Sequence, residues 1–100
     1  MVYKSRLASQ EITELFEAIM TLKTTEEYYR FFEDLATVGE LQSLAQRLSV
    51  AKKLLAEEKY TAIAEETGAS TATISRVKRC LNYGADGYKL VLDRLKKSED

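Results

Sequence analysis

Histidine, tryptophan and proline are absent from this chain of 100 residues, and cysteine occurs only once, at Cys80. Without histidine or a glycine-rich phosphate-binding loop, the chain lacks the groups that most often carry acid–base and nucleophilic catalysis. The adjacent pairs Glu57-Glu58 and Glu65-Glu66 are predicted to lie on solvated surfaces rather than in a catalytic site. Histidine and cysteine, the usual ligands of zinc, are equally scarce. We therefore predict that the protein is not an enzyme and that it holds no metal and no cofactor.

Long apolar runs are missing as well. No segment approaches the roughly 20 apolar residues of a membrane-spanning helix, and the first residues lack an apolar signal region. A single cysteine cannot form an internal disulfide, which fits a reducing compartment. These features predict a cytoplasmic protein with no membrane partner.

The lack of proline and the small number of glycines, four in all, favour helices. The composition is 45% hydrophobic and 31% charged, which is typical of a globular protein. The length is that of a single domain covering residues 1–100. The sequence therefore predicts an all-α fold of about six helices.

Four of these helices have a wide apolar face. The first is capped by Ser5 or Ser9, and the next two begin with capping boxes, Thr24 with Glu27 and Thr37 with Glu40. The third is expected to run to about residue 58 and the last to begin near residue 86. The inward positions are Ile12, Leu15, Phe16, Ile19 and Leu22, then Tyr28, Phe31, Phe32 and Leu35, then Leu41, Leu44, Leu48, Ala51 and Leu55, then Tyr88, Val91, Leu92 and Leu95. So short a chain cannot bury all four faces in one core, which predicts a homodimer rather than a monomeric bundle.

Residues 60–81 show the pattern of a helix-turn-helix. Gly68 lies where the chain must turn sharply, and a positive φ is readily adopted there only by glycine. Ser70 or Thr71 can cap the second helix. The inward positions recur at helical spacing and are Ile63, Ala64, Ile74, Val77 and Leu81. Such a unit inserts its second helix into the major groove of double-stranded DNA.

The outer face of this second helix has the chemistry of a DNA-binding surface. Small and hydroxylated side chains let the backbone approach base edges, and arginine binds guanine or phosphate. A packed helical hairpin without a role in DNA binding would show the same turn, but a face free of carboxylates favours DNA. The predicted DNA-binding residues are Thr61, Ser70, Thr71, Ala72, Thr73, Ser75, Arg76 and Arg79.

Charge is unevenly distributed along the chain. Residues 1–58 hold seven Lys/Arg and ten Asp/Glu, a net of −3, whereas residues 59–100 hold eight and six, a net of +2. The basic part is expected to face DNA. The function predicted is therefore sequence-specific DNA binding in transcription regulation. The alternative is a helical protein–protein interaction adaptor that uses the helix-turn-helix as a scaffold.

Two stretches, LAQRLSVAKKLL at 44–55 and TATISR at 71–76, resemble the tryptophan repressor-like family, and more closely its YerC/YecD-type branch. The resemblance covers most of the chain. It implies an intertwined, all-helical homodimer that regulates bacterial transcription, with two helix-turn-helix units projecting from it.

The resemblance also indicates a ligand pocket, lined here by Arg47, Arg76, Val77 and Cys80. In the tryptophan-sensing member, two arginines enclose the indole, and Arg47 and Arg76 match them. That member has glycine where this chain has Val77, and serine where it has Cys80. A valine side chain and an indole ring cannot fill the same space. Tryptophan is therefore not expected to bind, and any other small-molecule effector is unknown.

The base-contacting positions differ from the sensor too. Thr61 and Ala64 replace an arginine and a lysine of its first helix, and Arg79 is an additional cation. The operator sequence is therefore not transferable to this chain.

Overall fold

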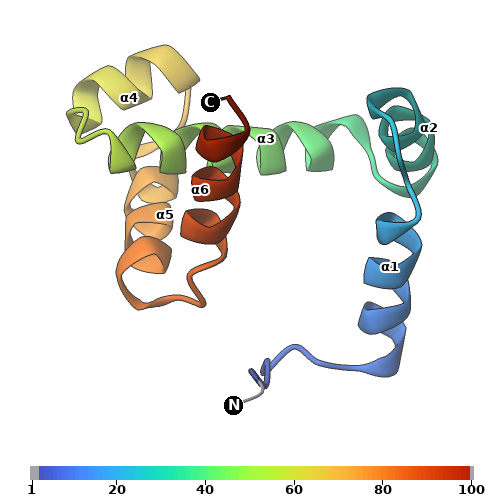
Figure 1. Cartoon of the computed structure of the whole chain (residues 1–100). Coiled ribbons are helices and arrows are strands. Elements are labelled where there is room, and N and C mark those ends of the chain that lie inside the picture. The colour runs from blue at the N-terminus through green and yellow to red at the C-terminus, as the bar shows by residue number, and fades with distance from the viewer. Residues whose placement is uncertain (1–2, 100) are drawn as a thin grey trace. The chain divides into compact units, whose positions relative to one another are not determined.

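The computed structural model describes residues 3–99, which form six α-helices and no strand (Figure 1). The predicted all-α class and the number of helices are confirmed. The helices are α1 (Gln10–Met20), α2 (Thr25–Leu35), α3 (Val38–Leu55), α4 (Tyr60–Thr67), α5 (Thr71–Tyr83) and α6 (Gly87–Glu99). Among the described residues, none of the helices is both long and apolar enough to cross a membrane.

Two compact units meet between Val38 and Gly39, and each is described by itself. The prediction of one domain over residues 1–100 stays a prediction.

The first unit contains α1 and α2, and both begin at hydroxyl caps. Ser9 is the cap of α1, since its Oγ accepts a hydrogen bond from the amide of Ile12 at 3.1 Å. The Oγ1 of Thr24 accepts from the amide of Glu27 at 3.2 Å, as the capping box predicts. The carboxylate of Glu27 accepts from the amide of Lys23, the residue before the cap, at 2.8 Å. Each helix therefore has its start fixed by the local sequence.

Neither helix of this unit contains a buried residue. Phe16 is 56% exposed, Met20 78% and Tyr29 61%. Phe31 and Phe32 are half-buried, with ring centroids 5.6 Å apart in an edge-to-face arrangement. The apolar faces predicted for α1 and α2 thus lie largely open to solvent within the unit.

The second unit is organised around α3, which ends earlier than predicted. The helix stops at Leu55 rather than near residue 58, because Glu57 adopts a left-handed conformation with φ 60°. The amide of Glu58 donates to the carbonyl of Lys53 at 3.1 Å, and that of Glu57 to Leu54 at 3.0 Å. These two bonds form a Schellman motif. Glycine usually occupies the left-handed position, so its absence hid this helix end in the sequence.

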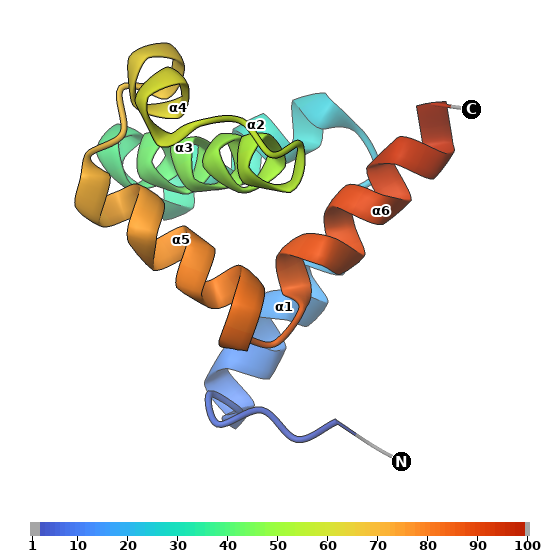
Figure 2. The ribbon, with the colours of Figure 1, turned by 90° about the vertical axis from the view of Figure 1, so that its left-hand side faces the viewer.

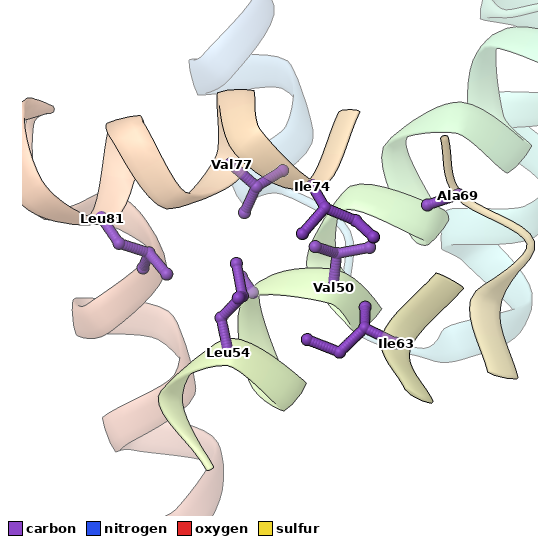
Figure 3. Close-up of a cluster of buried hydrophobic side chains, with 8 residues drawn as sticks. Val50, Leu54, Ile63, Ala69, Ile74, Val77 and Leu81 are labelled. Carbon is purple, nitrogen blue, oxygen red and sulfur yellow. The ribbon is translucent and has the colours of Figure 1, made fainter. Parts of the chain in front are cut away.

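Helices α3, α4 and α5 enclose the hydrophobic core (Figures 2 and 3). The fully buried side chains of Val50 and Ile63 join α3 to α4, and Ile74 joins α5 to both. The buried residues are Val50, Ala51, Leu54, Ile63, Ala69, Ile74, Val77 and Leu81. On α3, the buried positions are Val50, Ala51 and Leu54, whereas Leu44, Leu48 and Leu55 of the predicted seam remain exposed.

A tight turn connects α5 to α6, and the two helices diverge from it (Figure 2). The amide of Gly84 donates to the carbonyl of Cys80 at 2.8 Å, and a Cβ on Gly84 would lie 2.4 Å from that oxygen. Asp86 adopts φ 62° and its carbonyl accepts from the amide of Leu90 at 3.0 Å. Helix α6 packs through half-buried Tyr88 and Leu92, and none of its described residues is fully buried.

Candidate nucleic-acid interface

The turn between α4 and α5 is built around Gly68 and Thr67. Gly68 adopts φ 74°, and its amide donates to the carbonyl of Ala64 at 2.9 Å. The hydroxyl of Thr67 donates to the carbonyl of Ile63 at 2.6 Å and accepts from the amide of Ala69 at 3.1 Å. Ala69 is buried in the core. The turn predicted at Gly68 is therefore fixed by backbone conformation, by side-chain hydrogen bonds and by packing.

Ser70 caps α5, the second helix of the pair. Its Oγ accepts from the amide of Thr73 at 3.1 Å and donates to the Thr73 Oγ1 at 3.0 Å. Of the two caps left open by the sequence, Ser70 is thus the one used. Ser70 and Thr73 bind one another, whereas Thr71, the first residue of the helix, is exposed.

The exposed face of α5 has the composition that the sequence predicts. Ala72, Ser75, Arg76 and Arg79 recur at i, i+3, i+4 and i+7 and are all exposed. The opposite face, Ile74, Val77 and Leu81, is buried. Helix α5 contains no carboxylate. One side of the helix is therefore committed to the core, and the side carrying the two arginines is open to solvent.

Two more exposed cations lie close to this face in the sequence but outside the predicted set. Lys59 directly precedes α4 and makes no side-chain capping bond, and Lys78 lies on α5 between Arg76 and Arg79. Thr61 is exposed in the first turn of α4. Their positive charge is the one property in the sequence that could have added these two lysines to the predicted DNA-binding residues.

Polar contacts between α3 and α4 were not foreseen from the sequence. The Nε2 of Gln46 donates to the carbonyl of Thr67 at 3.1 Å. The Nζ of Lys53 lies 2.5 Å from the carboxylate of Glu66 and 3.8 Å from that of Glu58. Glu58 and Glu66, one from each of the two adjacent glutamate pairs that were predicted to be solvated, therefore both face Lys53.

The contact changes the proton affinity of both partners. The hydrogen bond to Glu66, aided by attraction to Glu58 and Glu66, raises the pKa of Lys53 against a smaller effect of burial. The hydrogen bond from Lys53 lowers the pKa of Glu66. Both groups are therefore held in their charged forms.

The four residues predicted to line a ligand pocket have different environments. Val77 is 2% exposed and belongs to the core cluster with Val50 and Leu54 (Figure 3). Arg47 on α3 is half-buried, and Arg76 and Cys80 on α5 are exposed. Within residues 3–99, neither guanidinium has an ion pair. The side chain of Val77 is packed in the core among other buried side chains.

Comparison with known proteins places this helix-turn-helix in a family. The family model described as Trp repressor protein matches residues 10–96. The chain belongs to the Trp repressor protein family.

Relatives within the Trp repressor protein family agree over most of the chain. YerC of Bacillus subtilis is 58% identical over 94 residues, which cover 94% of this chain and 90% of YerC. A Trp operon repressor homolog of Chlamydia caviae is 32% identical over 85 residues, or 84% of each chain. The expected resemblance to the YerC-type branch is confirmed.

Solved structures agree with the fold. A TrpR-like protein of Eubacterium eligens superposes with a TM-score of 0.88 at 55% identity, covering 91% of this chain and 94% of that one. A Staphylococcus aureus protein described as a candidate Trp repressor gives 0.87 at 54% identity, covering 91% of each chain. The six helices are therefore those of a Trp repressor-like fold.

Proposed function

We propose that the chain is a sequence-specific DNA-binding transcription regulator that acts in the cytoplasm as a homodimer and does not require tryptophan. The observation that carries this proposal is the face of α5 formed by Ala72, Ser75, Arg76 and Arg79. It is exposed, free of carboxylates and opposite to a fully buried stripe. Short side chains beside two guanidinium groups suit base edges and phosphates. Membership of the Trp repressor protein family supports the same function.

A second copy of the chain is proposed to cover the exposed apolar faces. Residues of α3 and α6, together with Ala56, line an open groove of about 780 Å³. Leu48, Leu55 and Leu95 in this groove are apolar, and each is at least a third exposed. Apolar surface of this extent is typical of a protein interface. A dimer would also present two α5 helices about 34 Å apart to successive major grooves.

Tryptophan independence is proposed from the packing of Val77. The side chain fills the position where a tryptophan sensor has glycine, and its neighbours Val50 and Leu54 are buried beside it. Binding an indole there would require several buried side chains to move. Close-packed interiors resist such movement.

DNA binding is tested by titrating a fluorescent duplex, selected by the protein from a random pool, at several salt concentrations. We expect affinity to fall steeply with salt, because phosphate contacts release counterions. Arg76→Ala and Arg79→Ala should each weaken binding by about 1–3 kcal/mol. Arg94→Ala, which removes an exposed arginine from α6, is the matched control. Unchanged affinity in both α5 variants would refute the assignment of this face.

The adaptor alternative is favoured by the exposed apolar faces of α1 and α2. The same titration separates the two functions, since an adaptor would show no duplex binding at any salt concentration.

Sedimentation equilibrium at micromolar concentration tests the proposed dimer, and a monomer over the whole concentration range would refute it.

A further inference from the structure

One face of α3 holds the first helix of the helix-turn-helix by three kinds of contact. Gln46, Val50 and Lys53 recur at i, i+4 and i+7, so they lie on one side of the helix. Val50 and Ile63 of α4 are both fully buried in the shared core. On either side of Val50, Gln46 binds the carbonyl of Thr67 and Lys53 binds the carboxylate of Glu66.

We propose that Gln46 and Lys53 are positioning residues for DNA binding, because they fix the orientation of α4 on α3 and so the direction in which α5 leaves the turn. The proposal rests on the proposed DNA-binding function. On this proposal, contacts within the chain orient the helix-turn-helix, and no bound small molecule is needed.

The need for such contacts follows from the small size of α4. The helix has eight residues, and Ile63 is its one fully buried side chain. Half-buried Ala64 is the other α4 side chain packed against the core. Apolar packing through two side chains of this kind has no directional preference, so it permits tilting and rotation of α4. Hydrogen bonds and ion pairs depend on direction and distance, so they restrict those movements.

Both polar contacts act at the end of α4 that adjoins the turn. Glu66 and Thr67 are its last two residues, and Gly68 follows at once. The final carbonyls of a helix lack partners within the helix, and Gln46 supplies one for Thr67. The hydroxyl of the same threonine binds the amide of Ala69. Displacement of this end would therefore move the start of α5.

Lys53 is poorly suited to a direct phosphate contact. Its side chain is 27% exposed, and Nζ already faces the carboxylates of Glu58 and Glu66. An exposed ion pair contributes little to stability, so its consequence should be sought in geometry. A phosphate contact by Lys53 and a positioning role predict opposite effects of removing the charge of Glu66.

The decisive variant is Glu66→Gln, with Glu65→Gln as its matched control. Each removes one negative charge from α4, and no ion pair is formed by Glu65 among residues 3–99. Electrostatics alone predicts that both variants bind a duplex more tightly than the wild type. Positioning predicts that Glu66→Gln instead binds the selected duplex about two- to fivefold more weakly, the range expected from an exposed ion pair, while Glu65→Gln does not.

Variants of α3 complete the test. Gln46→Met keeps the length of the side chain but removes its donor, and Lys53→Met removes the charge. Both should lower affinity for the selected duplex more than for an unrelated one. Lys53→Arg keeps the charge and should bind the selected duplex as tightly as the wild type, unlike Lys53→Met. The slope of affinity against salt should stay that of the wild type in Lys53→Met, because no phosphate contact is lost.

Hydrogen exchange of the unbound protein provides a readout independent of DNA. The amides of α4 should exchange faster in Gln46→Met and Lys53→Met, with those of α3 unchanged and the melting temperature close to that of the wild type. Unaltered exchange in α4, or tighter duplex binding by Glu66→Gln, would overturn the positioning role. Failure of the wild type to bind any duplex would instead refute the proposed function, and the exchange experiment would still decide whether these residues position α4.

Discussion

Truncating Val77 should reveal how much of the core depends on the side chain that is proposed to exclude an indole. Val77→Gly removes three carbons from a site that is 2% exposed. At about 0.8 kcal/mol per buried carbon, the transfer loss is about 2.4 kcal/mol. Glycine adds a few tenths of a kcal/mol through its low helix propensity, and the cavity adds more. The free energy of unfolding should therefore fall by about 3–4 kcal/mol.

Urea denaturation measures this change, and two variants serve as controls. Val77→Ala avoids the low helix propensity of glycine and should cost about 1.5–2.5 kcal/mol, mostly from the two lost methyl groups. Ile74→Ala opens a cavity elsewhere in the same core and should cost about 2–5 kcal/mol. A loss below about 1 kcal/mol for Val77→Gly would mean that the side chain is not packed as described.

Calorimetric titration with tryptophan supplies the functional half of the experiment. We expect no heat of binding from the wild type or Ile74→Ala at millimolar ligand, and at most weak binding by Val77→Gly. Saturable tryptophan binding by the wild type would refute the reasoning about Val77. DNA affinity that rises with tryptophan would refute it equally.

Three further predictions concern backbone conformation and the ion pair. Gly84→Ala should lower the free energy of unfolding by about 1–3 kcal/mol, because the new Cβ would lie 2.4 Å from the carbonyl oxygen of Cys80; an unchanged urea midpoint would contradict this. Glu57→Gly should raise the free energy of unfolding by about 0.5–1 kcal/mol, since it relieves the left-handed conformation at φ 60°; Glu65→Gly, in the interior of α4, should destabilise instead. The lowered pKa of Glu66 means that its contribution to stability is complete above the ordinary glutamate range and is lost as the pH falls through its lower folded-state pKa. Thermal melts should therefore show a steeper loss in acid for the wild type than for Glu66→Gln, and parallel curves would show that the pair has no net effect.

The sequence predicted the helix-turn-helix well because its signals are local. Gly68 marks the turn by its conformation, Ser70 caps the following helix, and the spacing of Ile74 and Val77 identifies the buried face. Each signal depends on residues within one or two turns of the chain. The same locality explains why the exposed side of α5 follows directly from the periodicity of its buried side.

Features that depend on contacts between residues far apart in the sequence could not be predicted from it. The contacts of Gln46 with Thr67 and of Lys53 with Glu66 join residues 21 and 13 positions apart. Charged and amide side chains at those positions do not themselves specify a partner. The end of α3 was missed for a different reason, because Glu57 occupies a conformation that sequence patterns associate with glycine.

The position of the core in the sequence has a consequence for how the chain folds during synthesis. Within the described part of the chain, all eight buried residues lie in the segment from Val50 to Leu81, so their contacts close only short loops. Low contact order favours rapid folding, and this segment should fold as soon as it leaves the ribosome. Phe16, Met20 and Tyr29 emerge earlier and gain no burial from that event. The nascent chain would therefore carry a folded helix-turn-helix while the apolar side chains of α1 and α2 are still exposed, and the proposed pairing with a second chain would protect them from aggregation.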